Sequence, residues 1–345
     1  MSERMSCPDC QEFVSDNGDT RSQSNKCEKF VSCRKGMHIF FDRMFHRRNT
    51  NPNPNVLSSY EKSTLESIRN WETVKGKRAV LCGVTYNKQK YKLKGTSYDV
   101  ICMRELLISR FGFPISSIHI LAEMDSYPHP TKRNIEEALR WLVKDNQHGD
   151  SLVFYFSGHG LWKPDFFEDE VDGFNELICP VDFRTAGLIV DNDINDTIVR
   201  PLKSGVKLHA IIDACHSGTI LDLSDVYNLK EKVWLDNRSP SGVCKGTSGG
   251  HAISISACED SQLAVDTSAF PESGKQMEGA MTYTFRKALE NPCVTYAGLL
   301  ASMHKGILAA QTQGFSLRGM FHRERLQEPL LSSSKVFDVN EPFVL

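Results

Sequence analysis

The chain has 345 residues and a formal net charge of −2, and its sequence pI is about 6.6. This balance gives no basic field, so we expect neither a nucleic-acid partner nor an anionic-membrane partner. No apolar run approaches the roughly 18 residues of a membrane span, and the N-terminus lacks the apolar stretch of a secretory signal. The eleven cysteines are therefore expected to be reduced thiols in the cytosol or the nucleus.

Apolar periodicity predicts alternating strands and helices in the first part of the folded body. Predicted strands lie at 78–86, 117–122, 151–156 and 207–213. Predicted helices lie at 99–111 and from the Thr131 cap through about Lys144. This alternation predicts an α/β fold with a mostly parallel central sheet and helices on both faces.

The pattern changes beyond residue 223. Residues 224–250 combine charges with the turn-forming runs SPSG and GTSGG, which predicts a surface loop. Further elements are expected as a strand at 252–257, helices at 279–290 and 296–310, and a last strand near 335–338.

Composition divides the chain into five parts. They are a Cys-rich segment (1–50), a linker (51–76), a first catalytic half (77–223), a connecting loop (224–250) and a second half (251–345).

Two glycine-flanked motifs follow two of the predicted buried strands. The strand at 151–156 leads into Ser157-Gly158-His159-Gly160, and the strand at 207–213 leads into Ala214-Cys215-His216. Sites of open α/β sheets lie at the carboxyl ends of strands, so His159 and Cys215 are expected to meet there. Imidazole can take the thiol proton or pair with the thiolate, which is the nucleophile. The backbone N–H groups of Gly160 and Cys215 are candidates for an oxyanion hole.

The motif set resembles one family of cysteine peptidases. SGHG at 157–160 and DACHSG at 213–218 form the motif pair of metacaspases, and His159 precedes Cys215 by a caspase-like interval. Further matching runs are VDGFNELICPVDF (171–183), GLIVDNDIN (187–195), TIVRPL (197–202), KGTSGG (245–250) and GAMTYTF (279–285). The chain therefore resembles a plant type I metacaspase. The resemblance implies a caspase-hemoglobinase fold.

A buried carboxylate beside the nucleophile favours a cationic substrate side chain, and Asp213 occupies that position. The resemblance extends this pocket to Ser157 and Asp99, and it implies cleavage of protein or peptide substrates after Arg or Lys. The family usually reads G-C-x-N-D before the pocket Asp. This chain reads GTSYD at 95–99, which keeps the Asp and replaces Cys and Asn.

The resemblance also implies a Ca²⁺ site at Asn175, Asp191, Asn192 and Asp222. Two of these four positions carry Asn where the family has carboxylates. Asn still offers a carbonyl oxygen, but the lost charge predicts weaker Ca²⁺ affinity than in relatives. Asp193 is a partial substitute in the sequence. The alternative is a polar loop without an ion.

The N-terminal cysteines resemble a degenerate zinc finger. Cys7 and Cys10 form a close pair, whereas Cys27 and Cys33 are more widely spaced. These four residues are the expected Zn²⁺ ligands, with His38 as an alternative to Cys33. A disordered thiol-bearing segment is the competing interpretation.

The implied function is peptide-bond hydrolysis through a thioester, in plant cell death or stress proteolysis. The resemblance further implies a monomer and self-cleavage in the connecting loop, for which the candidates are Lys230, Lys232, Arg238 and Lys245. Three alternatives stay open: an inactive binding scaffold, a peptidase of the same fold with Asn or Asp preference, and a zinc-dependent adaptor.

Overall fold

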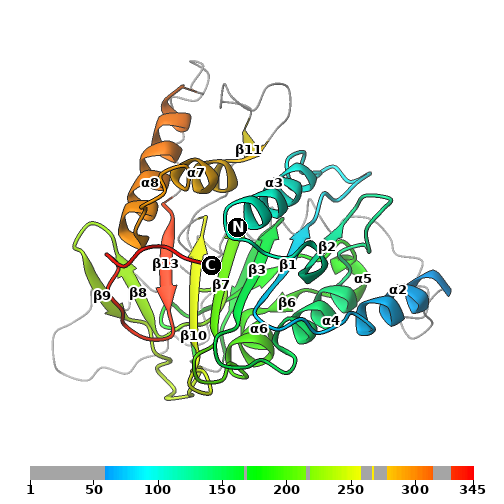
Figure 1. Ribbon diagram of the computed structural model, residues 1–345, viewed down its shortest axis with the longest axis horizontal. Coiled ribbons are helices and arrows are strands. Elements are labelled where there is room, and N and C mark those ends of the chain that lie inside the picture. Colours follow the sequence, from blue (N-terminus) through cyan, green and yellow to red (C-terminus); the bar gives the residue numbers. More distant parts are fainter. Residues whose placement is uncertain (1–58, 167–168, 215–217, 258–265, 268–277, 314–327) are drawn as a thin grey trace, which may run out of the picture. The chain divides into compact units, whose positions relative to one another are not determined.

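An eight-stranded sheet runs through the described part of the chain, in the order β2-β1-β3-β7-β10-β13-β8-β9. The computed structural model (Figure 1) describes residues 59–345 except 167–168, 215–217, 258–265, 268–277 and 314–327. The described residues all belong to one unit, Pro52–Leu345. The Cys-rich segment lies outside the described residues, and with it the predicted zinc ligands Cys7, Cys10, Cys27 and Cys33.

Five strands form the parallel part of the sheet. They are β2 (Ile118–Ala122), β1 (Lys77–Gly83), β3 (Ser151–Ser157), β7 (Lys207–Asp213) and β10 (His251–Ser256). After its first residue, each of β1, β3, β7 and β10 is buried throughout. Burial on both faces explains why these strands read as apolar runs. The five predicted strands are confirmed, although β1 ends three residues before the predicted boundary.

Three strands extend the sheet in antiparallel fashion. They are β13 (Leu330–Ser333), β8 (Asp225–Asn228) and β9 (Val233–Asp236). The predicted surface loop 224–250 therefore contains a hairpin, whose strands are held by the contact of Tyr227 with Trp234 at 5.3 Å between ring centroids. The last strand lies at 330–333 rather than 335–338. In the sequence, the apolar pair Leu330-Leu331 marks this strand. Leu331 is apolar because it packs in the hydrophobic core.

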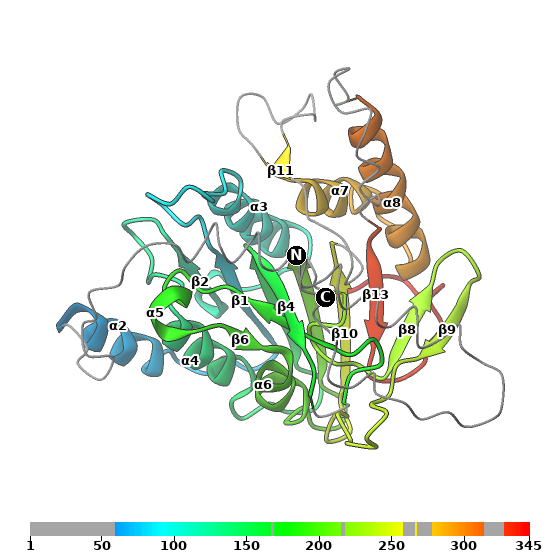
Figure 2. The same cartoon turned by 180° about the vertical axis from the view of Figure 1, so that it is seen from behind.

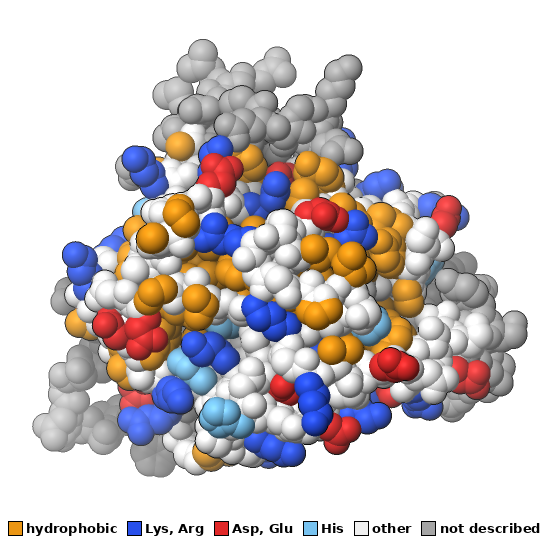
Figure 3. Space-filling view, viewed as in Figure 1, with side chains coloured by type: hydrophobic (Ala, Val, Ile, Leu, Met, Phe, Trp, Pro, Cys, Tyr) orange, Lys and Arg blue, Asp and Glu red, His pale blue; other side chains and the backbone are white. Residues whose placement is uncertain are grey.

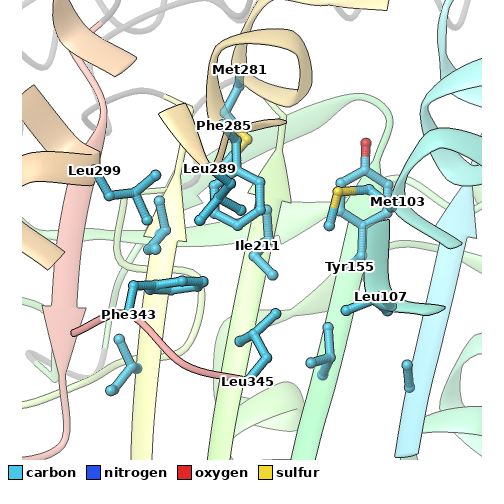
Figure 4. Packing of buried hydrophobic residues seen from close by; sticks show 14 of the residues in the cluster. Met103, Leu107, Tyr155, Ile211, Met281, Phe285, Leu289, Leu299, Phe343 and Leu345 are labelled. Carbon is cyan, nitrogen blue, oxygen red and sulfur yellow. The ribbon is translucent and has the colours of Figure 1, made fainter. Parts of the chain in front are cut away.

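One face of the sheet is covered by α3 (Thr96–Ser109), α7 (Ala280–Ala288) and α8 (Tyr296–Gln313). These three helices lie beside one another in both views (Figures 1 and 2), and contacts join α3 to α7 and α7 to α8. Figure 4 shows how their side chains meet the strands and the C-terminal segment in one hydrophobic core. The predicted helices at 99–111, 279–290 and 296–310 are confirmed within a few residues.

The opposite face is covered by α4 (Lys132–Val143), and α2 (Ser59–Arg69) packs against α4. Neighbouring residues of a strand point to opposite faces, and Arg78 points away from the core that contains Ala79. The Arg78 guanidinium is fully buried, donates to the Lys144 carbonyl at 2.6 Å, and pairs with Asp150 at 3.2 Å. The Thr131 hydroxyl accepts from Asn134 N–H at 3.3 Å, which confirms the predicted helix cap.

Helix α2 lies within the segment 51–76, where the sequence predicts only a linker. Its Leu65 and Ile68 are buried, and it packs against α4. The spacing of these two residues by three positions is helical, but the segment is too short for that periodicity to stand out among its charged neighbours.

Shorter elements complete the described part of the chain. A three-stranded sheet consists of β4 (Gly160–Pro164), β5 (Phe174–Ile178) and β6 (Ile189–Val190), and β4 and β6 are labelled in Figure 2. Short helical turns are η2 (Ile115–Ser117), α5 (Phe183–Ala186), α6 (Asp191–Ile194) and η3 (Asn195–Val199). A two-stranded ribbon joins β11 (Asp266–Thr267) to β12 (Glu278–Gly279).

Basic and acidic side chains are interspersed on the face shown in Figure 3, with hydrophobic side chains between them. This mixture matches the net charge of −2. Among the described residues, every helix falls short of the length and apolarity that crossing a bilayer requires.

Candidate active site

The strands β3 and β7 end side by side, and their last residues, Ser157 and Asp213, are paired across the sheet. Gly158 N–H also donates to the Asp213 carbonyl at 3.2 Å. In the sequence, His159 follows Ser157 by two residues and Cys215 follows Asp213 by two. Cys215 itself lies outside the described residues, and its pairing with His159 stays a prediction.

The backbone of His159 is clamped by Tyr86 and Cys179. His159 N–H donates to the Tyr86 hydroxyl at 2.9 Å, and that hydroxyl donates to the Cys179 carbonyl at 2.7 Å. Cys179 N–H donates back to the His159 carbonyl at 3.0 Å. Tyr86 adopts a positive φ of 56°, which is unusual for an aromatic residue. The sequence carries no sign of this role, because Tyr86 reads as the last residue of a predicted strand.

The imidazole of His159 is oriented by a backbone carbonyl. Its Nε2 lies 2.7 Å from the Tyr91 carbonyl oxygen, and its ring centroid lies 4.7 Å from that of Tyr86. Because a carbonyl oxygen only accepts, Nε2 carries the hydrogen. In the neutral ring Nδ1 is then the basic nitrogen.

Two buried aspartates lie behind this edge, on either side of the N-terminus of α7. Ser157 Oγ donates to Asp99 Oδ2 at 3.1 Å, and Gly279 N–H donates to Asp99 Oδ1 at 3.0 Å. Asp213 Oδ2 accepts from Thr282, from the backbone N–H at 3.1 Å and from the hydroxyl at 2.6 Å. The structure therefore brings Asp99, Ser157 and Asp213 together, although Asp99 comes from α3 and the other two from adjacent strands.

Burial raises the pKa of Asp99 well above its ordinary value, and the negative charge of Asp213 adds to the rise. The hydrogen bonds from Gly279 and Ser157 act in the opposite direction. Two carboxylates held in one dry site repel each other, and a cationic ligand relieves that repulsion. The pair is thus suited to a basic side chain.

The sequence did not reveal the two residues of the α7 N-terminus that complete this site. A Cβ atom on Gly279 would lie 2.2 Å from Asp213 Oδ2 and 3.1 Å from Asp99 Oδ2. Glycine is therefore required there for close approach rather than for its backbone angles, since its φ of −61° suits any residue. Thr282 is a second such residue. Both fall in the quoted run 279–285, which gave no indication of their roles.

Gly160 opens β4 directly after His159 and pairs with Ile178 of β5. Its backbone N–H thus lies next in the chain to His159, the predicted catalytic residue. The predicted oxyanion role of Gly160 and Cys215 stays a prediction.

A second cluster of buried charges surrounds Lys245. Its ammonium pairs with Asp169 at 3.2 Å, with Asp222 at 3.1 Å and with Glu170. One carboxylate oxygen from each of Glu170, Glu176 and Asp222 lies within 4.8 Å of the other two. The lysine comes from the predicted connecting loop 224–250, so the cluster joins that loop to the loop that follows β7.

Of the predicted Ca²⁺ residues, Asp222 is part of this cluster and Asn192 contacts it. Asn192 Nδ2 donates to Asp169 Oδ2 at 3.1 Å and to Asn175 Oδ1 at 3.3 Å. Asp191 is fully buried, and its carboxylate accepts the backbone N–H of Asn192 at 2.6 Å and that of Glu176 at 2.5 Å. Sequence reasoning did not place Asp169, Glu170 and Glu176 in a site, and it named Lys245 only as a cleavage candidate, because Lys245 lies 75 positions from Glu170 along the chain.

The charges of this cluster perturb one another. Burial, and then repulsion from Asp222, raises the pKa of Glu170 to about 10 and that of Asp191 to about 8. For Lys245, burial lowers the pKa, but the surrounding carboxylates outweigh burial and the net shift is upward. One ammonium therefore compensates only part of the negative charge.

The donor set suits a hard divalent cation. Ca²⁺ takes carboxylate and carbonyl oxygens, and both are present here. Asp169 Oδ1 is buried without a hydrogen-bond partner among the described residues, and the ammonium of Lys245 already stands where a cation is surrounded by carboxylates.

Comparison with known proteins places these observations in a family. Residues 77–224 match the model described as "Metacaspase, peptidase C14 domain". Metacaspase-1 of Arabidopsis thaliana is 46% identical over 78% of this chain and 78% of its own length, and Metacaspase-3 of the same plant is 47% identical over 76% and 74%. A crystal structure of a Geobacter sulfurreducens protein shares the fold with a TM-score of 0.51, at 19% identity, over 78% of this chain and 97% of that one.

Proposed function

The chain belongs to the metacaspase family of peptidase C14 and is a cysteine-type endopeptidase with the caspase-like fold, and from this premise we propose that it cleaves after Arg or Lys. The observation that carries the proposal is the buried pair Asp99 and Asp213 at the edge where β3 and β7 end. An Arg or Lys side chain neutralises that pair, whereas an Asp side chain adds to its repulsion.

In the proposed reaction, the Cys215 thiolate attacks the carbonyl carbon after the basic residue. The tetrahedral oxyanion is stabilised by the backbone N–H groups of Gly160 and Cys215. His159 Nδ1 gives its proton to the leaving amine, and a thioester forms. His159 then removes a proton from water, which attacks the thioester and releases the acid product and the Cys215 thiolate.

The clamp around His159 suits this role. Tyr91 holds the Nε2 hydrogen, and Tyr86 fixes the backbone, so Nδ1 keeps one direction through both half-reactions. A general base must be positioned before its pKa matters. The ring is half-buried, which leaves it accessible to a bound peptide.

Purified full-length protein would be assayed on fluorogenic peptides that end in Arg, Lys, Asn or Asp, beside Cys215→Ala and Asp213→Asn. The proposal expects hydrolysis of the Arg and Lys peptides only, lost in Cys215→Ala and weakened in Asp213→Asn through a higher KM. Cleavage of the Asn or Asp peptide would refute the basic specificity, and activity in Cys215→Ala would refute the nucleophile.

Calcium is proposed as a stimulating cation, held by Asn175, Asp191, Asn192 and Asp222 together with the carboxylates around Lys245. A bound divalent ion would supply positive charge to this cluster, which is connected to Cys215 through the short segment that ends at Asp222. Calorimetric titration of Cys215→Ala with CaCl₂ tests this, and absence of a binding isotherm at millimolar calcium would refute it.

Self-cleavage in the connecting loop, a role in plant cell death or stress, a cytosolic or nuclear location and a monomeric state complete the proposal. Zn²⁺ is proposed for Cys7, Cys10, Cys27 and Cys33. Metal analysis of the full chain, with and without Cys7→Ser, tests the zinc, and size-exclusion chromatography tests the monomer.

A further inference from the structure

A chain of buried hydroxyl groups leads from the sheet to Asp213. The Tyr155 hydroxyl lies 2.7 Å from Thr282 Oγ1, which lies 2.6 Å from Asp213 Oδ2. Tyr155 and Thr282 have no exposed surface, and Figure 4 shows the Tyr155 ring beside Met103 in the core. An ionised carboxylate only accepts, so Thr282 gives its single hydroxyl hydrogen to Asp213. Tyr155 must then donate to Thr282.

We propose that Thr282 and Tyr155 are positioning residues that hold the Asp213 carboxylate ionised and in one orientation for the basic substrate side chain. This inference rests on the proposed specificity for Arg or Lys. Both hydrogen bonds from Thr282 reach Oδ2, so Thr282 fixes one oxygen of Asp213 and does not use Oδ1. Donors aimed at a carboxylate favour its charged form, which offsets burial beside Asp99.

The contact between Thr282 and Asp213 also caps the N-terminus of α7. Helix α7 begins at Ala280, and the backbone N–H of Thr282 is one of the first-turn donors that lack a partner within the helix. Asp213 accepts this N–H from outside the helix. Replacement of the hydroxyl alone leaves the N–H bond in place, so Thr282→Val separates positioning from helix capping.

The test compares Thr282→Val, Thr282→Ser and Tyr155→Phe on the Arg peptide. Thr284→Val is the matched control, because Thr284 is buried in the same helix but its hydroxyl donates to Ala280 O at 2.7 Å. The loss of one charge-assisted hydrogen bond in Thr282→Val is expected to lower kcat/KM roughly tenfold, mainly through KM. Thr282→Ser should stay within about threefold of wild type, and Thr284→Val should match wild type.

The dependence of kcat/KM on pH distinguishes a positioning role from misfolding, because misfolding would not shift the acid limb of this profile. Without the Thr282 hydroxyl the pKa of Asp213 rises, so the acid limb of kcat/KM should move to higher pH in Thr282→Val and not in Thr284→Val. Equal KM values and equal acid limbs in Thr282→Val and Thr284→Val would overturn the positioning role. If wild-type protein cleaves only Asn or Asp peptides, the proposed specificity fails instead, and the two failures are distinguishable.

A separate observation concerns Lys245, whose ammonium sits among the carboxylates described above. The side-chain exposures are 11% for Lys245 and Asp169, 6% for Glu170 and 1% for Asp222. An ammonium so buried excludes a second cation from the same oxygens, because two positive charges at contact distance repel strongly. The Lys245 carbonyl is also anchored, since it accepts Asn195 Nδ2 at 3.0 Å.

We infer that Lys245 is a tethered cation that occupies the acidic cluster, and that it leaves when a divalent cation is bound there. The inference deepens the proposed calcium regulation and rests on it. Asn195 also donates to the Leu221 carbonyl at 2.8 Å, so one amide ties the loop after β7 to the connecting loop. Departure of Lys245 would expose a basic residue in the segment where self-cleavage is proposed.

Binding and accessibility test this in full-length Cys215→Ala, which cannot cleave itself in the proposed mechanism. Lys245→Gln removes the competing charge and should bind calcium at least tenfold more tightly than the parent in calorimetric titration. The matched control is Lys230→Gln, because Lys230 is exposed and pairs with Glu328 at 2.9 Å. Its calcium affinity should equal that of the parent.

A lysine-specific protease reports the position of Lys245 directly. Cleavage after Lys245, followed by mass spectrometry, should be slow without divalent ions and at least tenfold faster with calcium, whereas cleavage after Lys230 should not change. Equal calcium affinities in Lys245→Gln and the parent would overturn the competition. Absence of calcium binding in both proteins would overturn it together with the proposed calcium site.

Discussion

Removal of the Tyr86 hydroxyl tests how the fold positions His159. In Tyr86→Phe, the His159 N–H loses an acceptor at 2.9 Å and the Cys179 carbonyl loses a donor at 2.7 Å. Two net hydrogen bonds at roughly 1 kcal/mol each predict a loss of about 2 kcal/mol, rising to about 4 kcal/mol if both backbone groups stay unsatisfied. The ring itself remains, so no cavity term is added.

In Tyr86→Phe, the loss of catalytic efficiency should be larger in proportion than the loss of unfolding free energy. A shift of about 1 Å in a catalytic group lowers the rate by up to about 100-fold, so kcat/KM on the Arg peptide should fall by 10- to 100-fold, mainly through kcat. Stability is measured by urea unfolding in the Cys215→Ala background, and activity is measured in the active protein. The matched control is Tyr227→Phe, since Tyr227 of β8 is also buried but packs against Trp234 of β9.

Two outcomes would refute this reasoning. If Tyr86→Phe keeps kcat/KM within about twofold of wild type, the hydroxyl does not position His159. If its urea midpoint equals that of Tyr227→Phe, the two backbone groups find other partners and the clamp contributes no stability.

Three further predictions follow from the same contacts. Gly279→Ala places a Cβ atom 2.2 Å from Asp213 Oδ2. The KM for the Arg peptide should therefore rise at least tenfold. An unchanged KM would show that α7 moves aside to admit the Cβ atom. Burial lowers the pKa of His209 to about 3. The free energy of unfolding should therefore fall by up to about 1.4 kcal/mol per pH unit as the pH drops below 6.5. In urea unfolding, His209→Leu should flatten this slope. Without divalent ions, mass spectrometry should find self-cleavage after Arg238 and not after Lys245. The reason is that the Arg238 side chain is 76% exposed and the Lys245 side chain only 11%. Cleavage after Lys245 and not after Arg238 would contradict this argument from burial.

The parallel half of the sheet was predictable because its strands are buried on both faces, and such strands are unbroken apolar runs. The hairpin of β8 and β9 was not, because its strands are four residues long and surrounded by charges. The same holds for α2, whose buried side chains Leu65 and Ile68 are separated by exposed residues.

In the candidate site, sequence motifs located residues but not the contacts that orient them. His159, Asp99 and Asp213 were named from their motifs, whereas Tyr86 and Thr282 were not. Their roles arise from long-range pairing, since Thr282 lies 69 positions from Asp213 and Tyr86 lies 73 from His159. Spacing along the chain contains no information about such pairs. Lys245 was named as a cleavage candidate, and its burial among carboxylates became visible only in the structure.

The N-terminus of α7 limits how the pocket can change during evolution or engineering. Asp99 and Asp213 accept the backbone N–H groups of Gly279 and Thr282, so under the proposed specificity each carboxylate would serve both a basic substrate side chain and the start of the helix. A substitution of either carboxylate that is meant to admit acidic or neutral substrates would also remove a helix cap worth about 1 kcal/mol. Selection for new specificity therefore meets a stability barrier, and a viable path must first re-cap α7 from another residue.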